Sequence, residues 1–345
     1  WAMDNIKTGG ESLAIAFELL GVHISEDSLG RLRVVTPIPL AELERPRIDV
    51  VVTVSGIFRD VFPGSMALLD SAVQSVADLD EPETSNRIRK RTRSLETSGL
   101  SPQEARLRVF GNGPGAYGGN LNYALDTGAW ENDAELARIF RSRKSFAYVS
   151  GEGLVRKQDL YGELTGTADC VLQSLDSVEI GLSDVDHYFD YLGGLSLQIQ
   201  EKTGRRAEVY LADTTTALGR IDRLEELGQR EARVKLLNPK WYSAMIDHGY
   251  EGVTELRTRL ENLYGLQATT RSLEDWVFDE TTRTFVEDRA MAEQLSELNP
   301  EAFRAMVDTL LEARDRSLWN PAEGISETLE ASSKRAEDAL EFTTH

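Results

Sequence analysis

Cysteine is almost missing from this sequence, since Cys170 is the only one in 345 residues. A disulfide framework within the chain is therefore excluded, and a cysteine-based zinc site is disfavoured. Cys170 lies in the apolar stretch 168–172, which predicts an inert thiol in the core. No apolar run approaches the ~18 residues that span a bilayer, and no signal-peptide pattern opens the chain. We therefore expect no transmembrane segment and a reducing compartment, either cytoplasm or plastid stroma.

Positive charge is also scarce. The chain has 38 Lys and Arg against 58 Asp and Glu, which gives a net charge of -20 and a pI near 4.7. An acidic surface repels phosphate backbones, so nucleic acid is not an expected partner. Positive charge is concentrated in one place, a basic cluster within residues 80–100. This cluster is either a solvated helix face or a docking surface for an acidic partner. The cluster consists of Arg87, Arg89, Lys90, Arg91 and Arg93.

The order of elements predicts an α/β fold. Residues 11–20 have helical spacing and stop at Gly21. The β-branched run 48–54 is typical of a buried strand, and a helix over 63–79 follows it. We expect mixed sheet layers with helices in the first two thirds and a helical C-terminal third. Further predicted strands are 145–149 and 207–212, and further predicted helices are 155–175, 183–203, 221–237, 240–247, 251–264, 288–296, 299–316 and 322–341.

The glycine-rich segment 111–120 (GNGPGAYGGN) resembles a nucleotide-binding loop only loosely. We expect it to follow a helix, which starts at the capping box Ser101-Pro102-Gln103-Glu104 and ends near Phe110, and not a strand. A dinucleotide site is therefore disfavoured, and no P-loop motif is present to bind ATP. The segment is either a tight irregular loop or a backbone that a flat ligand can approach, with Tyr117 available to stack on it.

Residues 183–204 carry the most informative pattern. Apolar residues recur on one helical stripe, and His187, Asp190, Tyr191 and Gly194 fall on the opposite side. His187 and Asp190 are spaced i,i+3, so their side chains can meet. An imidazole can accept a proton or ligate a metal, and a carboxylate can orient it. The alternative is an exposed polar helix face that happens to contain a histidine.

Two further candidates follow predicted strands, where open α/β sheets place their ligand sites. Arg59 could hold a carboxylate by a bidentate contact, or it could close a loop with Asp60. Asp213 could line the same face, or it could cap the next element. A change in pattern near 215–220 is the best candidate for a boundary within the chain.

Several strings together resemble the C-terminal region of the large subunits of class I metal chelatases, the family of magnesium chelatase and cobaltochelatase. They occur in the family's order and cover essentially the whole chain, 1–345, as the C-terminal part of the family's shared domain. The strings are Asp4–Thr8, Gly10–Ser12, Arg45–Val50, Gly56–Asp60, Ser142–Phe146, Asp186–Asp190, Ala212–Thr216 and Leu237–Tyr242.

This resemblance implies a porphyrin-binding catalytic subunit that inserts Mg²⁺, as substrate, into protoporphyrin IX during chlorophyll or bacteriochlorophyll synthesis. It implies that ATP is hydrolysed by separate AAA+ motor subunits, the I and D subunits. His187 and Asp190 match the family's His-x-x-Asp positions, so we expect them to be catalytic and metal-binding. Arg59, Tyr117 and Asp213 are expected substrate-binding residues.

Alternatives remain open at this point. The large subunit of cobaltochelatase shares the family pattern, and a non-catalytic porphyrin carrier or an interaction scaffold would also fit. The family's subunits are much longer than this chain, which begins at Trp1. We therefore expect a piece of a longer subunit that is inactive by itself.

Overall fold

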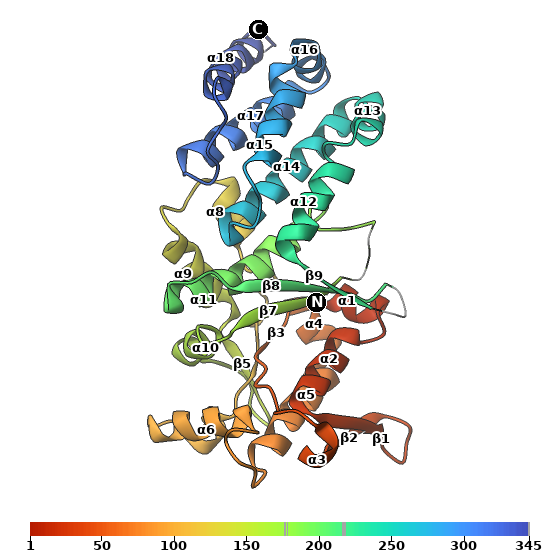
Figure 1. Cartoon of the computed structure of the whole chain (residues 1–345), viewed down its shortest axis with the longest axis vertical. Coiled ribbons are helices and arrows are strands. Elements are labelled where there is room, and N and C mark those ends of the chain that lie inside the picture. The colour runs from red at the N-terminus through yellow and green to blue at the C-terminus, as the bar shows by residue number, and fades with distance from the viewer. Residues whose placement is uncertain (176, 178, 216–218, 344–345) are drawn as a thin grey trace.

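The computed structural model describes residues 1–175, 177, 179–215 and 219–343. Helices and mixed sheets alternate along the first two thirds of this part, and helices close it, so the predicted α/β class is confirmed. In Figure 1 the three-stranded sheet lies in the middle of an elongated molecule, with the helices of the last third stacked at one end and a two-stranded hairpin at the other. None of the described helices is both long and apolar enough to cross a membrane.

The first sheet has the order β3-β4-β5-β6. Strands β3 and β4 run parallel, and the other neighbours are antiparallel. Two helices, α2 and α5, bury apolar residues such as Phe17, Leu20, Met66 and Leu69 in a core that also includes Val54 and Phe58. The elements are β3 (Val52–Thr53), β4 (Val109–Gly111), β5 (Phe146–Val149), β6 (Gly153–Arg156), α2 (Glu11–Leu20) and α5 (Pro63–Ala77).

The second sheet has the order β7-β8-β9, with β7 (Cys170–Leu175), β8 (Glu208–Asp213) and β9 (Arg220–Arg223). Strands β7 and β8 run parallel, from Cys170 opposite Glu208 to Leu175 opposite Asp213. Strand β9 pairs antiparallel with β8 across the predicted boundary at 215–220. Residues 216–218 of that boundary lie outside the described residues, so the division of the chain stays a prediction.

Shorter elements link the two sheets and form a separate hairpin of β1 and β2, which pair antiparallel. The hairpin strands are β1 (Val22–Glu26) and β2 (Leu32–Pro37). The linking helices are α1 (Ala2–Lys7), α3 (Leu40–Leu43), α4 (Gly56–Val61), α6 (Arg87–Thr97), α7 (Pro102–Ala105), α8 (Leu121–Asp126), α9 (Asp133–Lys144), α10 (Gln158–Thr165), the π-helix η1 (Tyr188–Gly193) and α11 (Gly194–Thr203).

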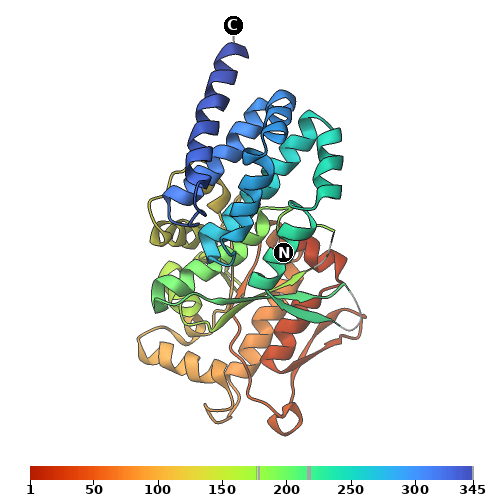
Figure 2. The same ribbon diagram turned by 45° about the horizontal axis from the view of Figure 1, so that its top comes forward.

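The last third is a stack of helices, visible from a second direction in Figure 2. The longest of these, α14, lies against η1, α13 and α17, and so joins the stack to the sheet layer. The helices are α12 (Leu224–Val234), α13 (Pro239–Asp247), α14 (Tyr250–Thr270), α15 (Trp276–Thr282), the π-helix η2 (Arg283–Glu287), α16 (Arg289–Leu298), α17 (Pro300–Asp315) and α18 (Ile325–Thr343).

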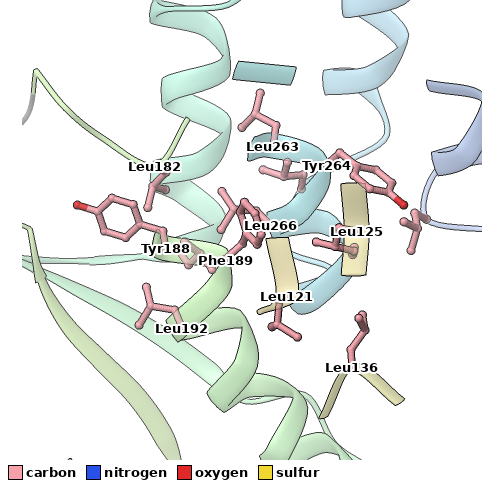
Figure 3. Packing of buried hydrophobic residues seen from close by; sticks show 14 of the residues in the cluster. Leu121, Leu125, Leu136, Leu182, Tyr188, Phe189, Leu192, Leu263, Tyr264 and Leu266 are labelled. Atoms are coloured by element: carbon pink, nitrogen blue, oxygen red, sulfur yellow. The ribbon is translucent and has the colours of Figure 1, made fainter. Parts of the chain in front are cut away.

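The main hydrophobic core is centred on the segment that the sequence singled out. Phe189 and Leu192 of η1 are buried among leucines of α8 and α14, including Leu121 and Leu266. Figure 3 shows this packing, with Tyr188 and Leu182 beside it. Each fully buried leucine or phenylalanine contributes about 1.5–3 kcal/mol. The apolar stripe predicted within 183–204 therefore does face the core.

Several local predictions are wrong. Residues 155–175 form the end of β6, then α10 and β7, and not one helix. Cys170, at the start of β7, is exposed and is not a core thiol. The helix after the capping box at Ser101 ends at Ala105, so the glycine-rich segment follows β4. Within the predicted strand 48–54, only Val52 and Thr53 form β3. In each case pairing with a distant strand decides the conformation, and local periodicity does not report it.

Candidate functional site

The segment that carries His187 and Asp190 does not follow ordinary helical winding. Residues 188–193 form the π-helix η1, which continues directly into α11. The wider π turn shifts the angular position of the side chains that follow, and such turns are frequent at functional sites. The apolar stripe is still buried, but the predicted contact between two particular side chains, His187 and Asp190, is not formed across this segment.

Asp190 is buried, and both of its carboxylate oxygens are engaged by the glycine-rich loop. The Gly119 N–H donates to Oδ2 at 2.6 Å, and the Leu121 N–H donates to Oδ1 at 2.9 Å. Burial raises the pKa of this carboxyl, and the two N–H donors oppose that shift. A Cβ at Gly119 would lie 2.7 Å from Oδ1, so only glycine allows the approach. Asp190 therefore fixes the end of the loop 111–120.

The i,i+3 spacing predicted a pair of His187 with Asp190. In the structure His187 is paired instead with its neighbour Asp186. His187 Nδ1 lies 2.7 Å from Asp186 Oδ1, and this contact lowers the pKa of Asp186. Asp186 Oδ2 in turn accepts a hydrogen bond from Asn122 Nδ2 at 2.8 Å. An imidazole that donates through Nδ1 keeps Nε2 free as an acceptor. The His187 side chain is 35% exposed.

A buried lysine lies behind this site. Lys144 Nζ donates to Asn112 Oδ1 at 2.8 Å and lies 3.6 Å from the centre of the Tyr191 ring. Burial lowers the pKa of Lys144 well below its usual range, while the nearby Asp190 carboxylate opposes the shift. Asn112 also donates to the Gly118 carbonyl, at 2.8 Å. Lys144 is therefore linked to the glycine-rich loop through the side chain of Asn112.

Arg59 and Tyr117 lie at the other end of the same loop. Arg59 Nη1 donates to the carbonyls of Asn112 at 3.0 Å and Gly113 at 2.5 Å, and its other nitrogens bind Asp60. A ligand carboxylate would have to displace Asp60 to bind Arg59. The Tyr117 ring is half exposed and lies 5.7 Å from the guanidinium carbon, and the Tyr117 carbonyl accepts a hydrogen bond from the Tyr191 hydroxyl.

A cavity of about 780 Å³ opens next to η1, with Tyr191 in its lining. Strands β3 and β7 and helix α2 form mainly apolar walls, while Tyr191, Leu192 and Trp1 lie at one side. The Trp1 ring meets the His187 ring edge-on, with centroids 4.3 Å apart, and Tyr191 stacks on the other side at 6.4 Å. The volume falls within the range of pockets that bind small molecules and cofactors. The imidazole therefore contacts two residues that line a space for an apolar ligand, although His187 is not itself part of that lining.

The remaining expected site residues do not join this group. Gly194 is buried, and a Cβ there would overlap the Phe140 ring, so this glycine serves close packing and not a ligand surface. Asp213, at the end of β8, accepts hydrogen bonds from the backbone and hydroxyl of Thr215. Among the described residues, no group of three or more His, Cys, Asp or Glu is placed to hold a metal ion.

Comparison with known proteins decides the family. The sequence profile of CobN/Magnesium Chelatase matches residues 1–325. The chain belongs to this family. It is 44% identical over 345 residues to "Magnesium-chelatase subunit ChlH, chloroplastic" from Oryza sativa subsp. indica, covering 99% of the chain and 25% of that protein. It is 40% identical to a magnesium-chelatase subunit of Cereibacter sphaeroides, covering 99% of the chain and 29% of that protein.

A solved structure of the CobN/Magnesium Chelatase family shows the same fold. The catalytic subunit of cobaltochelatase from Mycobacterium tuberculosis superimposes with a TM-score of 0.93 at 33% identity, over 96% of this chain and 28% of that one. The chain thus spans between a quarter and a third of the length of these relatives. The resemblance inferred from the short sequence strings is confirmed.

Two residues of this family member escaped the sequence analysis. Asp186 appeared only as the first residue of the string Asp186–Asp190, although its position directly before His187 could have suggested the pair. Lys144 had no signal, because Arg141, Arg143 and Lys144 look like the basic last turn of a surface helix. The burial of Lys144 follows from the packing of α11 against α9 and from the contact of Lys144 with the Tyr191 ring, which only the fold reveals.

Proposed function

We propose that this chain is the part of a magnesium chelatase large subunit that holds the macrocycle during insertion of Mg²⁺ into protoporphyrin IX. The observation that carries the proposal is the placement of His187, which is held by Asp186 and packs against Trp1 and Tyr191, two residues that line the 780 Å³ cavity. The identities of 44% and 40% to magnesium-chelatase subunits support this metal. ATP would be hydrolysed by the AAA+ partner subunits I and D. The word chloroplastic in the name of the rice relative supports the stromal alternative for the compartment.

The chemistry requires a base. Insertion replaces two pyrrole N–H protons with Mg²⁺, which gives up its water shell reluctantly. His187 would take a pyrrole proton at Nε2, because Nδ1 is held by Asp186, and the Asp186 carboxylate would stabilise the imidazolium that forms. Two protons leave the macrocycle, so His187 would act twice and release each proton to water. Tyr191 and Trp1 would hold the ring plane against the imidazole.

The experiment that tests this proposal is the substitution His187→Ala in the full-length subunit. We expect porphyrin affinity to be retained and ATP-dependent Mg²⁺ insertion to be lost, because only the base is removed. His248→Ala, at the exposed end of α13, is the matched control and should insert Mg²⁺ normally. Insertion at the wild-type rate by the His187 variant would refute the role of the imidazole.

Cobalt insertion is the second candidate, supported by the close structural similarity to the cobaltochelatase subunit. The same cavity and base would serve a corrinoid precursor and Co²⁺ in cobalamin synthesis. The two candidates differ in metal and macrocycle, so a metallation assay of the full-length protein with its partners, with Mg²⁺ against Co²⁺, separates them. We expect turnover with Mg²⁺ and protoporphyrin IX, and turnover with Co²⁺ and the corrinoid alone would reverse the choice.

A further inference from the structure

Helix α6 concentrates positive charge in a chain that is otherwise strongly acidic. Its eleven residues, Arg87–Thr97, contain five cations and a single glutamate, while the chain carries a net charge of -20. The buried face of the helix consists of Ile88, Thr92 and Leu95, so the cations cannot all point the same way. The direction of each cationic side chain decides whether it forms ion pairs within the chain or is available to a ligand.

Two of the five cations are used within the chain, on the side of α6 away from the cavity. Arg89 pairs with Asp80 at 2.8 Å and also donates to the Glu81 carbonyl. Arg93 pairs with Glu83 at 3.4 Å. These contacts tie α6 to the segment that precedes it. Neither arginine lines the cavity.

The other three cations line the cavity. Arg87, Lys90 and Arg91 share one face of α6 with Ser94, and all four residues border the 780 Å³ space. In the part of the chain that the structure describes, the side chains of these three cations make no hydrogen bond or ion pair. Arg87 lies three and four residues before the other two, and like charges at these spacings repel. An anion bound between them would relieve that repulsion.

The rest of the lining is mostly apolar, although Asp4, Asp49 and Asp169 also border the space. Asp49 is paired with Arg108, and Asp4 accepts a hydrogen bond from Ser12. The apolar part of the lining includes Val52 and Val54 from the β3 segment, Leu172 of β7, and Leu195 and Ile199 of α11. The space is therefore an apolar slot with three unpaired cations along one edge. A ligand that fits it has a flat apolar body and acidic groups on one side. A tetrapyrrole with carboxylate side chains has this distribution.

We propose that Arg87, Lys90 and Arg91 of α6 bind the carboxylate side chains of the tetrapyrrole. This inference rests on the proposed function, and it assigns the carboxylate contact to α6 in place of Arg59, whose donors are already engaged. With its acidic edge on α6, the macrocycle extends along the apolar walls toward Leu192 and Tyr191, beside His187.

An acidic protein partner is the rival occupant of these cations. Their position favours the small ligand, because the face they share borders a cavity with apolar walls. A partner that needs only positive charge would be served equally well by Arg93, which points elsewhere. The test therefore needs a readout that depends on the carboxylates of the ligand.

The experiment uses the full-length subunit with the double substitution Lys90→Gln and Arg91→Gln. The probes are deuteroporphyrin IX and its dimethyl ester, titrated by quenching of protein fluorescence. We expect the dissociation constant of the free acid to rise about 10- to 100-fold, since two charge-assisted contacts are lost. The ester has no carboxylate, so its affinity should be the same for wild type and variant. Arg93→Gln on the same helix is the matched control and should bind both probes like wild type.

The outcomes separate this inference from the proposed function. If wild type binds the free acid and the double variant binds it equally well, the α6 contact is refuted and the proposed function stands. An equal loss of affinity for acid and ester would also overturn it, because the effect would then be one of shape. A variant that loses only the AAA+ partner subunits would assign the cations to a protein partner instead. If wild type binds neither probe, both proposals fail.

Discussion

The clearest quantitative prediction concerns Asp190→Asn. The substitution keeps the shape of the side chain but removes its charge and turns one of its two acceptor oxygens into a donor. The new amide oxygen could accept a hydrogen bond from either Gly119 or Leu121, and the amide nitrogen would then face the other backbone N–H. One charge-assisted hydrogen bond is lost and one buried donor is left unpaired. This costs about 2–3 kcal/mol.

The loss should appear first in the glycine-rich loop. The Tyr191 hydroxyl still binds the Tyr117 carbonyl and Asn112 still binds the Gly118 carbonyl, so the fold as a whole should persist. If the loop opens locally, 2–3 kcal/mol corresponds to about 30- to 150-fold faster amide exchange. Hydrogen exchange of the full-length subunit, followed by mass spectrometry over residues 111–121, measures this.

Asp247→Asn, at the exposed end of α13, is the matched control and should leave exchange over residues 111–121 unchanged. The reasoning would be refuted if Asp190→Asn left the exchange of Gly119 and Leu121 at the wild-type rate. If Asp190 instead binds the metal, the loop should stay protected while the Mg²⁺ concentration needed for insertion rises. The experiment therefore distinguishes a positioning residue from a metal ligand.

Two further predictions test packing and loop attachment. Gly194→Ala should destabilise the subunit by about 1–3 kcal/mol, because the added methyl overlaps Phe140. Thermal unfolding measures this loss. The control is Gly64→Ala, where a Cβ meets nothing within 4 Å, and it should keep the wild-type melting temperature. Arg59→Gln should speed amide exchange across residues 112–116 and leave porphyrin affinity unchanged, since the Arg59 guanidinium is already bound to Asp60. If the variant instead lost affinity for deuteroporphyrin IX but not for its dimethyl ester, the carboxylate contact would belong to Arg59.

The sequence predicted best those helices that begin or end at a recognisable capping residue. The helix 11–20 ends at Gly21, which adopts the left-handed conformation that glycine favours at this position. The capping box at Ser101 and Glu104 is present as expected. Helix α17 over 300–315 follows Asn299, whose side chain accepts from the Ala302 N–H. A cap or a left-handed glycine acts over a few residues, so the sequence alone can reveal it.

What the sequence could not reveal depends on partners far along the chain. Strand β7 begins at Cys170, which pairs with Glu208, and nothing within residues 155–175 encodes that contact. The π turn at 188–193 is set by packing of η1 against α14 and by the capture of Asp190 by Gly119. The predicted pair of His187 with Asp190 failed for this reason. The identity of the candidate base could still be inferred, because the family's string of residues contains it.

Whether a polar side chain already has hydrogen-bond partners within the chain separates structural residues from ligand-binding residues in this site. Arg59 and Asp190 were natural candidates for binding substrate or metal, but the acceptors and donors they need are supplied by the chain itself. A ligand that bound them would first have to break those contacts, and the buried groups left behind would cost about 1–3 kcal/mol each. Lys90 and Arg91 line the cavity itself and have no such contacts to lose. Binding an anion there costs only their exposure to water, so the acidic edge of a macrocycle gains most by lying against α6.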